Sequence, residues 1–155
     1  MGAQAPEKGH RWFAAFWQWQ NRHEPAAVRR WRQETVGGAR GRVLEIGCGA
    51  GANFGYYTNA VTQIVAIDPD PYMLERATRR AEGLDQPIEI RSASAQELPF
   101  EDGAFDTVVS TVNMCSVQDA PAALREVRRV LRPVASTASS ITFATKTPWA
   151  RFSRT

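Results

Sequence analysis

The sequence predicts an α/β domain built around a parallel sheet, and three observations lead to this prediction. Short apolar runs typical of buried strands alternate with segments whose apolar residues recur at helical spacing. An apolar strand at 43–46 runs directly into Gly47, Gly49 and Gly51, as at a sharp strand-to-helix turn. The 155 residues, of which 43% are hydrophobic, suffice for one domain with a core. Such alternation predicts right-handed crossovers and helices on both faces of the sheet.

Each element has its own signal along the chain. The aromatic segment 10–22 places Trp12, Phe13, Phe16 and Trp17 on one helical face, and a second helix begins near Pro25 and ends at Gly37-Gly38. Strands are expected at 42–47, 63–68, 87–92 and 105–111, helices at 52–57, 71–82 and 120–131, and a short turn near 95–98. The apolar faces of the last two helices are Met73, Leu74, Ala77 and Ala81, and Ala123, Leu124, Val127, Val130 and Leu131.

Charge and cysteine content argue against several classes of function. The net charge of +3 comes from 19 basic and 16 acidic residues, and the whole excess lies in 134–155, so we expect no nucleic-acid partner. The two cysteines, Cys48 and Cys115, are too far apart in sequence to suggest a disulfide framework or a metal site. No apolar run reaches transmembrane length and no secretory signal is present, so we expect a cytoplasmic protein.

The glycine loop indicates a nucleotide-type pocket at the end of the first strand. Gly47-x-Gly49-x-x-Ala52 satisfies the dinucleotide fingerprint, which leaves a nicotinamide-dependent oxidoreductase as an alternative. Glu45 argues against that alternative, because a carboxylate beside the loop repels a pyrophosphate. A carboxylate there suits a ligand with an ammonium group, such as S-adenosylmethionine.

Further motifs strengthen this interpretation. Glu45-Ile46-Gly47-Cys48-Gly49-Ala50-Gly51 resembles motif I of the class I S-adenosylmethionine-dependent methyltransferases. Asp68 resembles the acidic residue that ends their second strand, and 98–106 resembles their "LPF…D..FD" segment before the fourth strand. The loop 115–117 and the segment 124–133 resemble the following loop and helix. The resemblance implies a Rossmann-like parallel sheet of order 3-2-1-4-5, S-adenosylmethionine as cofactor, and methyl transfer as the reaction.

The resemblance also implies which residues bind the cofactor. Gly47, Gly49 and Gly51 would line its methionine half, with Cys48 and Asn53 in the same loop, and Glu45 would face its ammonium group. Asp68 would accept the ribose hydroxyls, Pro69 and Met73 would flank the adenine, and Ser94 and Ala95 would meet the adenine edge. Met73 is equally consistent with a core role. Thr111 and Asn113 would lie near the transferred methyl group, where Asn113 could instead make a local turn bond.

The sequence identifies no catalytic base. His10 and His23 are candidate proton acceptors for a substrate, but a surface position is the favoured interpretation of each. The acceptor implied by the resemblance is a small or lipid-like molecule. The aromatic N-terminus is interpreted in three ways: as a lid, as cover for the flank of the sheet, or as a membrane-surface contact through 10–32. The oligomeric state is not predicted.

The sequence divides into an aromatic N-terminal segment at 1–40, a cofactor-binding domain at 41–133 and an atypical tail at 134–155. The tail holds nine of the 19 Ser and Thr residues, and it lacks the Gly-Gly turn and the very apolar fifth strand that the resemblance implies. Inserting one G after the Pro133 codon, with suitable synonymous codons, restores both. We therefore hypothesise a frameshift, with the C-terminal strands missing and only a short fifth strand at 139–145. A non-catalytic, cofactor-binding fragment is the corresponding alternative to an enzyme.

Overall fold

The protein folds around a parallel five-stranded sheet, and the prediction of a Rossmann-like α/β domain is confirmed. The computed structural model describes residues 24–111, 117–133 and 140–144, the last of these as backbone only. The strands lie in the order β3-β2-β1-β4-β5, as the resemblance implied. Their bounds are β1 Gly41–Ile46, β2 Val61–Asp68, β3 Ile88–Ser92, β4 Thr107–Thr111 and β5 Ser140–Ala144.

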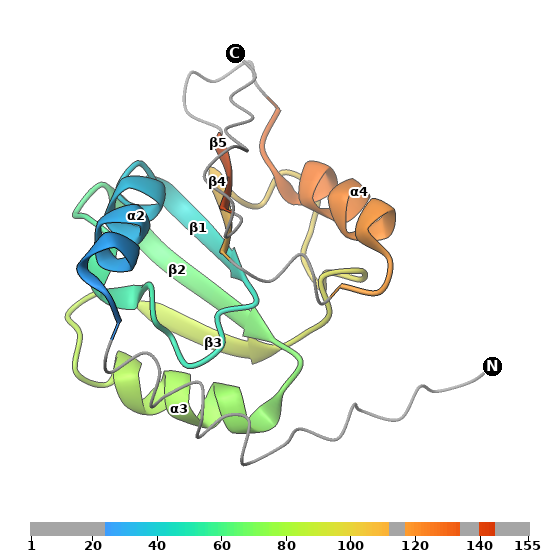
Figure 1. Cartoon of the computed structure of the whole chain (residues 1–155). Coiled ribbons are helices and arrows are strands. Elements are labelled where there is room, and N and C mark those ends of the chain that lie inside the picture. Colours follow the sequence, from blue (N-terminus) through green and yellow to red (C-terminus); the bar gives the residue numbers. More distant parts are fainter. Residues whose placement is uncertain (1–23, 112–116, 134–139, 145–155) are drawn as a thin grey trace.

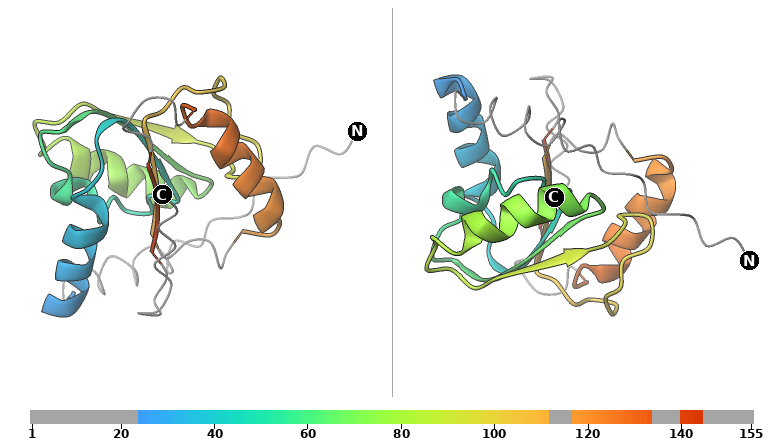
Figure 2. Two further views of the ribbon diagram at one scale, coloured as in Figure 1. Left: turned by 90° about the horizontal axis from the view of Figure 1, so that it is seen from above. Right: turned by 90° about the horizontal axis from the view of Figure 1, so that it is seen from below.

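The central strands are buried on both faces because helices cover each side of the sheet. The helices are α2 Ala26–Val36, α3 Pro71–Ala81 and α4 Ala120–Val130. One apolar core joins residues of α2 and α3 to the sheet, and a second core joins α4 to the opposite face. Figures 1 and 2 show this division, with α2 and α3 on one side and α4 on the other.

The helices begin and end largely where the sequence predicts. Pro71 and Pro121 lie in the first turns of α3 and α4, and the carboxylates of Asp70 and Asp119 accept backbone N–H groups there. One residue of the predicted apolar faces is misplaced: Leu124 is exposed on α4, whereas Ala123 and its helical neighbours are buried. The buried stripe of α4 is narrower than predicted, because the helix packs on the sheet through one side only.

The helix expected at 52–57 is not formed, and this is the main error in the predicted elements. The chain makes only a single 3-10 turn, η1 Phe54–Tyr56, before Tyr57 takes an extended conformation. The side chains explain the difference, because Asn53, Phe54 and Tyr57 are all buried and point to different partners. Asn53 donates to Thr111 of β4 and Tyr57 donates to Glu45 of β1, so these two side chains tie the segment to the sheet in its irregular form.

The expected fifth strand is present at the edge of the sheet. β5 pairs in parallel with β4 over its whole length, from Thr107 opposite Ser140 to Thr111 opposite Ala144. Several predictions lie outside the described residues: the aromatic helix at 10–22, both histidines, Asn113, the first two residues of the loop at 115–117 and the rest of the tail. The frameshift hypothesis therefore stays a prediction.

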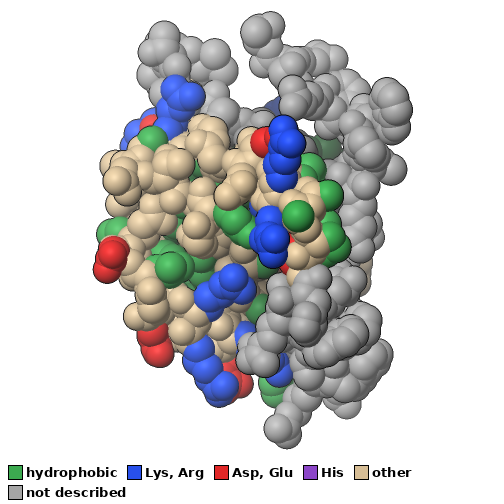
Figure 3. Space-filling model, turned by 60° about the vertical axis from the view of Figure 1, so that its left-hand side comes forward, with side chains coloured by type: hydrophobic (Ala, Val, Ile, Leu, Met, Phe, Trp, Pro, Cys, Tyr) green, Lys and Arg blue, Asp and Glu red, His purple; other side chains and the backbone are tan. Residues whose placement is uncertain are grey.

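The surface carries mixed charge. On the face shown in Figure 3, arginine side chains are separated by uncharged surface or lie beside acidic ones. Exposed ion pairs such as Arg30 with Glu34 and Arg79 with Glu75 contribute to this pattern. Within the described part of the chain, no helix has both the length and the apolar character needed to cross a bilayer.

Candidate functional site

The parallel register brings the predicted site residues to one edge of the sheet. Ile46, the last residue of β1, lies between Ile67 of β2 and Ser110 of β4, and Asp68 lies opposite Ser92 of β3. The loops that follow β1, β2 and β3 therefore leave the sheet side by side. This carboxyl edge is where open α/β sheets bind their ligands.

The glycine loop is held against the neighbouring strand. The N–H groups of Gly47 and Cys48 both donate to the carbonyl of Ile67, at 2.8 and 3.0 Å, and Gly51 N–H donates to Cys48 O at 2.9 Å. Gly47, Gly49 and Gly51 have φ values of 68°, 53° and 74°, in the left-handed region. Three residues in this region explain why the loop needs glycine.

Gly49 and Gly51 are glycines for different reasons. A Cβ on Gly51 would lie 2.5 Å from a ring carbon of Phe54, so this glycine makes room for the buried ring. A Cβ on Gly49 would meet no atom of the described residues within 4 Å, so these residues leave the space beside Gly49 open. The loop thus presents bare backbone to open space at the sheet edge, which fits a ligand that approaches the main chain.

Asp68 joins the loop to the end of β2. Its carboxylate accepts N–H groups of Gly49 at 3.0 Å and of Asp70 at 2.9 Å, one on each oxygen. Burial raises the pKa of Asp68, while these two hydrogen bonds oppose the rise. A carboxylate has about four acceptor positions, so two are left for the hydroxyls of a ribose. Asp68 and the open space at Gly49 together fit an adenosine-containing cofactor.

Glu45 lies beneath the loop in a buried polar network. Glu45 is 1% exposed. Its carboxylate accepts hydrogen bonds from Asn53 Nδ2 at 2.9 Å and from the Tyr57 hydroxyl at 2.8 Å. The same Asn53 nitrogen donates to Thr111 Oγ1 at 2.8 Å. The structure therefore brings three predicted site residues, from β1, the loop and β4, into direct contact. An ammonium group would reach Glu45 through its remaining acceptor positions, because both oxygens already hold one protein donor.

The protonation of Glu45 is set by this environment. Burial raises the pKa of Glu45 from 4.5 to about 7, although hydrogen bonds from Tyr57 and Asn53 and the charge of Arg32 lower it. Since the folded pKa exceeds the ordinary value, ionising Glu45 disfavours folding as the pH rises from 4.5 through about 7. The same burial raises the pKa of the Tyr57 hydroxyl and of the Cys48 thiol. A cationic ligand would favour the ionised carboxylate.

The other predicted residues take more varied positions. Met73 is buried against Ala50 of the loop, which supports its core role, while Pro69 is exposed. Cys48 is buried as a free thiol. Ser94 is exposed just beyond β3 and its hydroxyl accepts Gln96 N–H at 3.2 Å, and Ala95 is half-buried.

Sequence reasoning missed Arg32, Tyr57 and Ser110. Arg32 was detectable in principle, because Val28, Arg32 and Val36 recur every four residues and put a charge on the apolar face of α2. Tyr57 carries no such signal. The Ser110 hydroxyl is buried at the end of β4 and, in the part of the chain that the structure describes, has no hydrogen-bond partner. Ser110 directly precedes Thr111 in the sequence.

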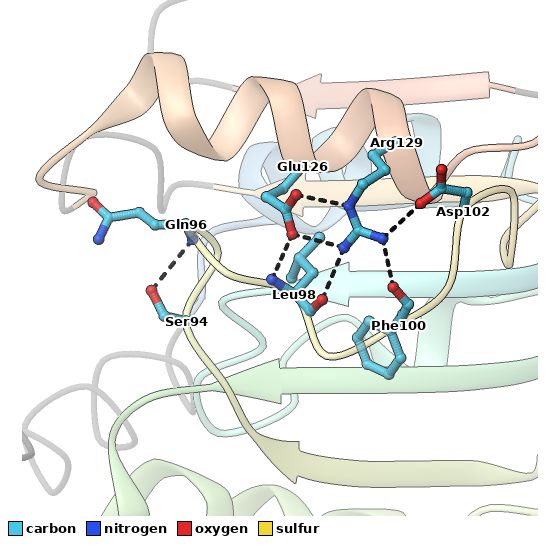
Figure 4. Close-up of polar contacts among 7 residues, drawn as sticks. All are labelled: Ser94, Gln96, Leu98, Phe100, Asp102, Glu126 and Arg129. Atoms are coloured by element: carbon cyan, nitrogen blue, oxygen red, sulfur yellow. Dashed lines mark hydrogen bonds and ion pairs between the residues drawn. The ribbon is translucent and has the colours of Figure 1, made fainter. Parts of the chain in front are cut away.

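A second polar cluster fixes the loop that follows β3 (Figure 4). Arg129 of α4 donates to the carbonyls of Leu98 and Phe100 at 2.9 and 2.6 Å and forms ion pairs with Asp102 and Glu126. Glu126 in turn accepts Leu98 N–H at 2.8 Å. The loop that begins at the predicted adenine edge is thereby tied to α4.

Replacement of Arg129 by methionine is expected to lower the free energy of unfolding by about 1–3 kcal/mol, because two partly buried carbonyls lose their donor. Arg129 also lowers the pKa of Glu126 to about 2, so the contribution of the pair is complete above pH 4.5 and lost as the pH falls toward 2. In urea unfolding, the difference in the free energy of unfolding between wild type and Arg129→Met should thus be smaller at pH 3 than at pH 7. The control is Arg128→Met, on the exposed side of α4; an equal loss there would contradict the role of Arg129.

Comparisons with known proteins agree with this geometry. The methyltransferase domain family matches residues 44–137. Human thiol S-methyltransferase TMT1B is 40% identical over 101 residues, 62% of this chain and 41% of that protein. Phosphatidylethanolamine N-methyltransferase of Cereibacter sphaeroides is 38% identical over 94 residues, 59% of this chain and 46% of that protein.

A solved structure supports the fold. A proposed S-adenosyl-L-methionine-dependent methyltransferase from Methanococcus maripaludis superposes with a TM-score of 0.71 over 85% of this chain and 64% of that one, at 22% identity. The matched part of this chain spans less than half the length of the two curated relatives. The family match covers more than half of this chain. The chain therefore belongs to the methyltransferase domain family, the class I methyltransferases whose cofactor is S-adenosyl-L-methionine.

Proposed function

We propose that this chain binds S-adenosyl-L-methionine at the carboxyl edge of its sheet and transfers the methyl group to a small or lipid-like acceptor. One observation is central: the open backbone at Gly49 and the carboxylate of Asp68 are joined by a hydrogen bond at the ends of adjacent strands. This arrangement offers a surface for close approach beside acceptor positions for ribose hydroxyls.

In this proposal the residues of the site bind and orient. The cofactor supplies the electrophilic methyl group when bound, so the protein's contribution is alignment and exclusion of water. Asp68 would hold the ribose of the cofactor, and the loop 47–51 would hold its methionine half. Ser94 and Ala95 would contact the adenine edge. Glu45 would counter the ammonium charge, and Asn53, which also donates to Thr111, would hold the carboxylate in position. The roles of Cys48, Pro69, Met73 and Asn113 remain proposals of the same kind.

The acceptor class is supported by the relatives. One is named for a thiol and another for phosphatidylethanolamine, so a small thiol or an amine on a lipid headgroup is proposed for this chain. A membrane-surface contact through 10–32 would suit the second acceptor. We also propose a cytoplasmic location, which a free Cys48 and the absence of a disulfide pattern in the sequence support.

Two alternatives predict different binding. A nicotinamide-dependent oxidoreductase would bind NAD(H), and neither of the named relatives is of that class. A non-catalytic fragment would bind S-adenosyl-L-methionine without turnover. The same 155-residue protein can be used to separate all three.

Calorimetry on the full chain with S-adenosylhomocysteine and with NADH tests the binding step. Transfer of a labelled methyl group from S-adenosyl-L-methionine to a thiol, an amine, a phenol and phosphatidylethanolamine vesicles tests the reaction. We expect binding of S-adenosylhomocysteine and transfer to one acceptor. Binding without transfer to any acceptor would favour the non-catalytic fragment, and binding of NADH alone would overturn the proposal.

A further inference from the structure

Helix α2 reaches the cofactor-binding region through one buried arginine. Arg32 donates Nη1 to Asn53 Oδ1 at 2.8 Å and Nε to Glu24 Oε1 at 2.6 Å. The side chains of Arg32 and Glu24 are only 11% and 12% exposed. Asn53 is itself 1% exposed. The charged side chain of Arg32 is therefore held between the carboxylate of Glu24, which precedes α2, and the buried amide of Asn53 beneath the glycine loop.

Arg32 determines which way the Asn53 amide faces. An amide has one accepting oxygen and one donating nitrogen, whereas a guanidinium can only donate. Asn53 must therefore turn its oxygen to Arg32, which leaves its nitrogen for the two acceptors on the other side, Glu45 Oε1 and Thr111 Oγ1. Without Arg32, the buried amide oxygen loses its donor, and the orientation that serves Glu45 loses one of the three hydrogen bonds that hold it.

We propose that Arg32, anchored by Glu24, is a positioning residue of the cofactor site: it orients Asn53, and Asn53 in turn holds the Glu45 carboxylate and the Thr111 hydroxyl. Arg32 touches neither the loop backbone nor Asp68 in any interaction that the structure shows, so it acts through Asn53. The consequence for cofactor affinity rests on the proposed function. The consequence for Glu45 does not, because it concerns the free protein.

The charges around Glu45 give this proposal a specific signature. Besides burial, the groups that act on the pKa of Glu45 are the Tyr57 hydroxyl after η1, the Asn53 amide and the charge of Arg32 of α2, while Glu45 itself acts on the pKa of the Cys48 thiol. Arg32 is the cation among these groups, and the carboxylate of Glu24 partly neutralises its charge. Removing Arg32 should therefore favour the protonated form of Glu45, and removing the charge of Glu24 should favour the ionised form. A residue that only supported the fold would not produce two shifts of opposite sign.

The test compares Arg32→Met, Arg32→Lys and Glu24→Gln with wild type. The matched control is Arg30→Met, which removes an arginine from the exposed side of the same helix. The titration of Glu45 is followed in the ligand-free full chain from its carboxyl infrared band, which Glu45→Gln identifies. We expect the midpoint to rise by about one pH unit in Arg32→Met, to fall in Glu24→Gln, and to stay unchanged in the control.

Cofactor affinity is measured on the same proteins with S-adenosylhomocysteine at pH 6, 7 and 8. We expect binding about tenfold weaker in Arg32→Met, with the largest loss at pH 6 and 7, partial recovery in Arg32→Lys and no change in the control. If Arg32→Met does not fold, the opposite shift in Glu24→Gln and the affinity of Arg32→Lys still decide the question. An unchanged Glu45 midpoint in folded variants would overturn the inference. Wild-type protein that does not bind S-adenosylhomocysteine would overturn only the proposed function.

Discussion

Replacement of Gly49 by valine is expected to abolish cofactor binding, with affinity for S-adenosylhomocysteine reduced by more than about 100-fold. The backbone of Gly49 has φ +53°, which strains a β-branched residue. The new side chain would also extend into the open space beside the loop, which the proposed cofactor fills. Calorimetry on folded protein, with a melting curve for each variant, measures the effect.

Gly55→Val serves as the control for this substitution. Gly55 lies in the 3-10 turn four residues after Gly51, is exposed, and would also place a Cβ in open space. Because its backbone is not left-handed and it lies beyond the loop, its replacement should leave affinity near the wild-type value. Normal affinity in folded Gly49→Val would show that this loop does not face the cofactor.

Replacement of Asp68 by alanine is expected to weaken binding by about 1–3 kcal/mol, or about 5- to 150-fold, because the ribose hydroxyls lose their acceptor. The structure adds a second cause, since Asp68 also accepts the N–H of Gly49 and so holds the loop. An analogue without ribose hydroxyls separates the two causes. If the ribose contact dominates, this analogue should bind wild type and Asp68→Ala almost equally.

Asp70→Ala is the matched control for Asp68→Ala. Asp70 lies two residues later and its carboxylate caps α3 by accepting Tyr72 N–H at 2.8 Å. Its loss should lower stability by about 1 kcal/mol without weakening binding. Unchanged affinity in Asp68→Ala would remove Asp68 from the proposed site, and equal losses in both variants would point to a general effect of the turn.

The elements that the sequence predicted well are those with a strong local signal. β2 and α3 follow their apolar periodicity, and Asp70 with Pro71 marks the start of α3. The prediction failed at 52–57, where the pattern was compatible with a helix but Asn53 and Tyr57 are hydrogen-bonded to residues of β4 and β1. Local periodicity does not record such commitments, because they depend on what β1 and β4 present after the sheet has formed.

The sequence by itself determined the family motifs, the strand order that they imply and the position of Gly49 and Asp68 at strand ends. These follow from residues close together in the chain, where turn geometry and periodicity act. Only the tertiary structure decided that Glu45 lies buried beneath the loop and that Arg32, 21 residues before Asn53, orients the amide that holds it. A buried polar group must find its partner wherever the fold brings one, so such networks are fixed by packing between distant segments.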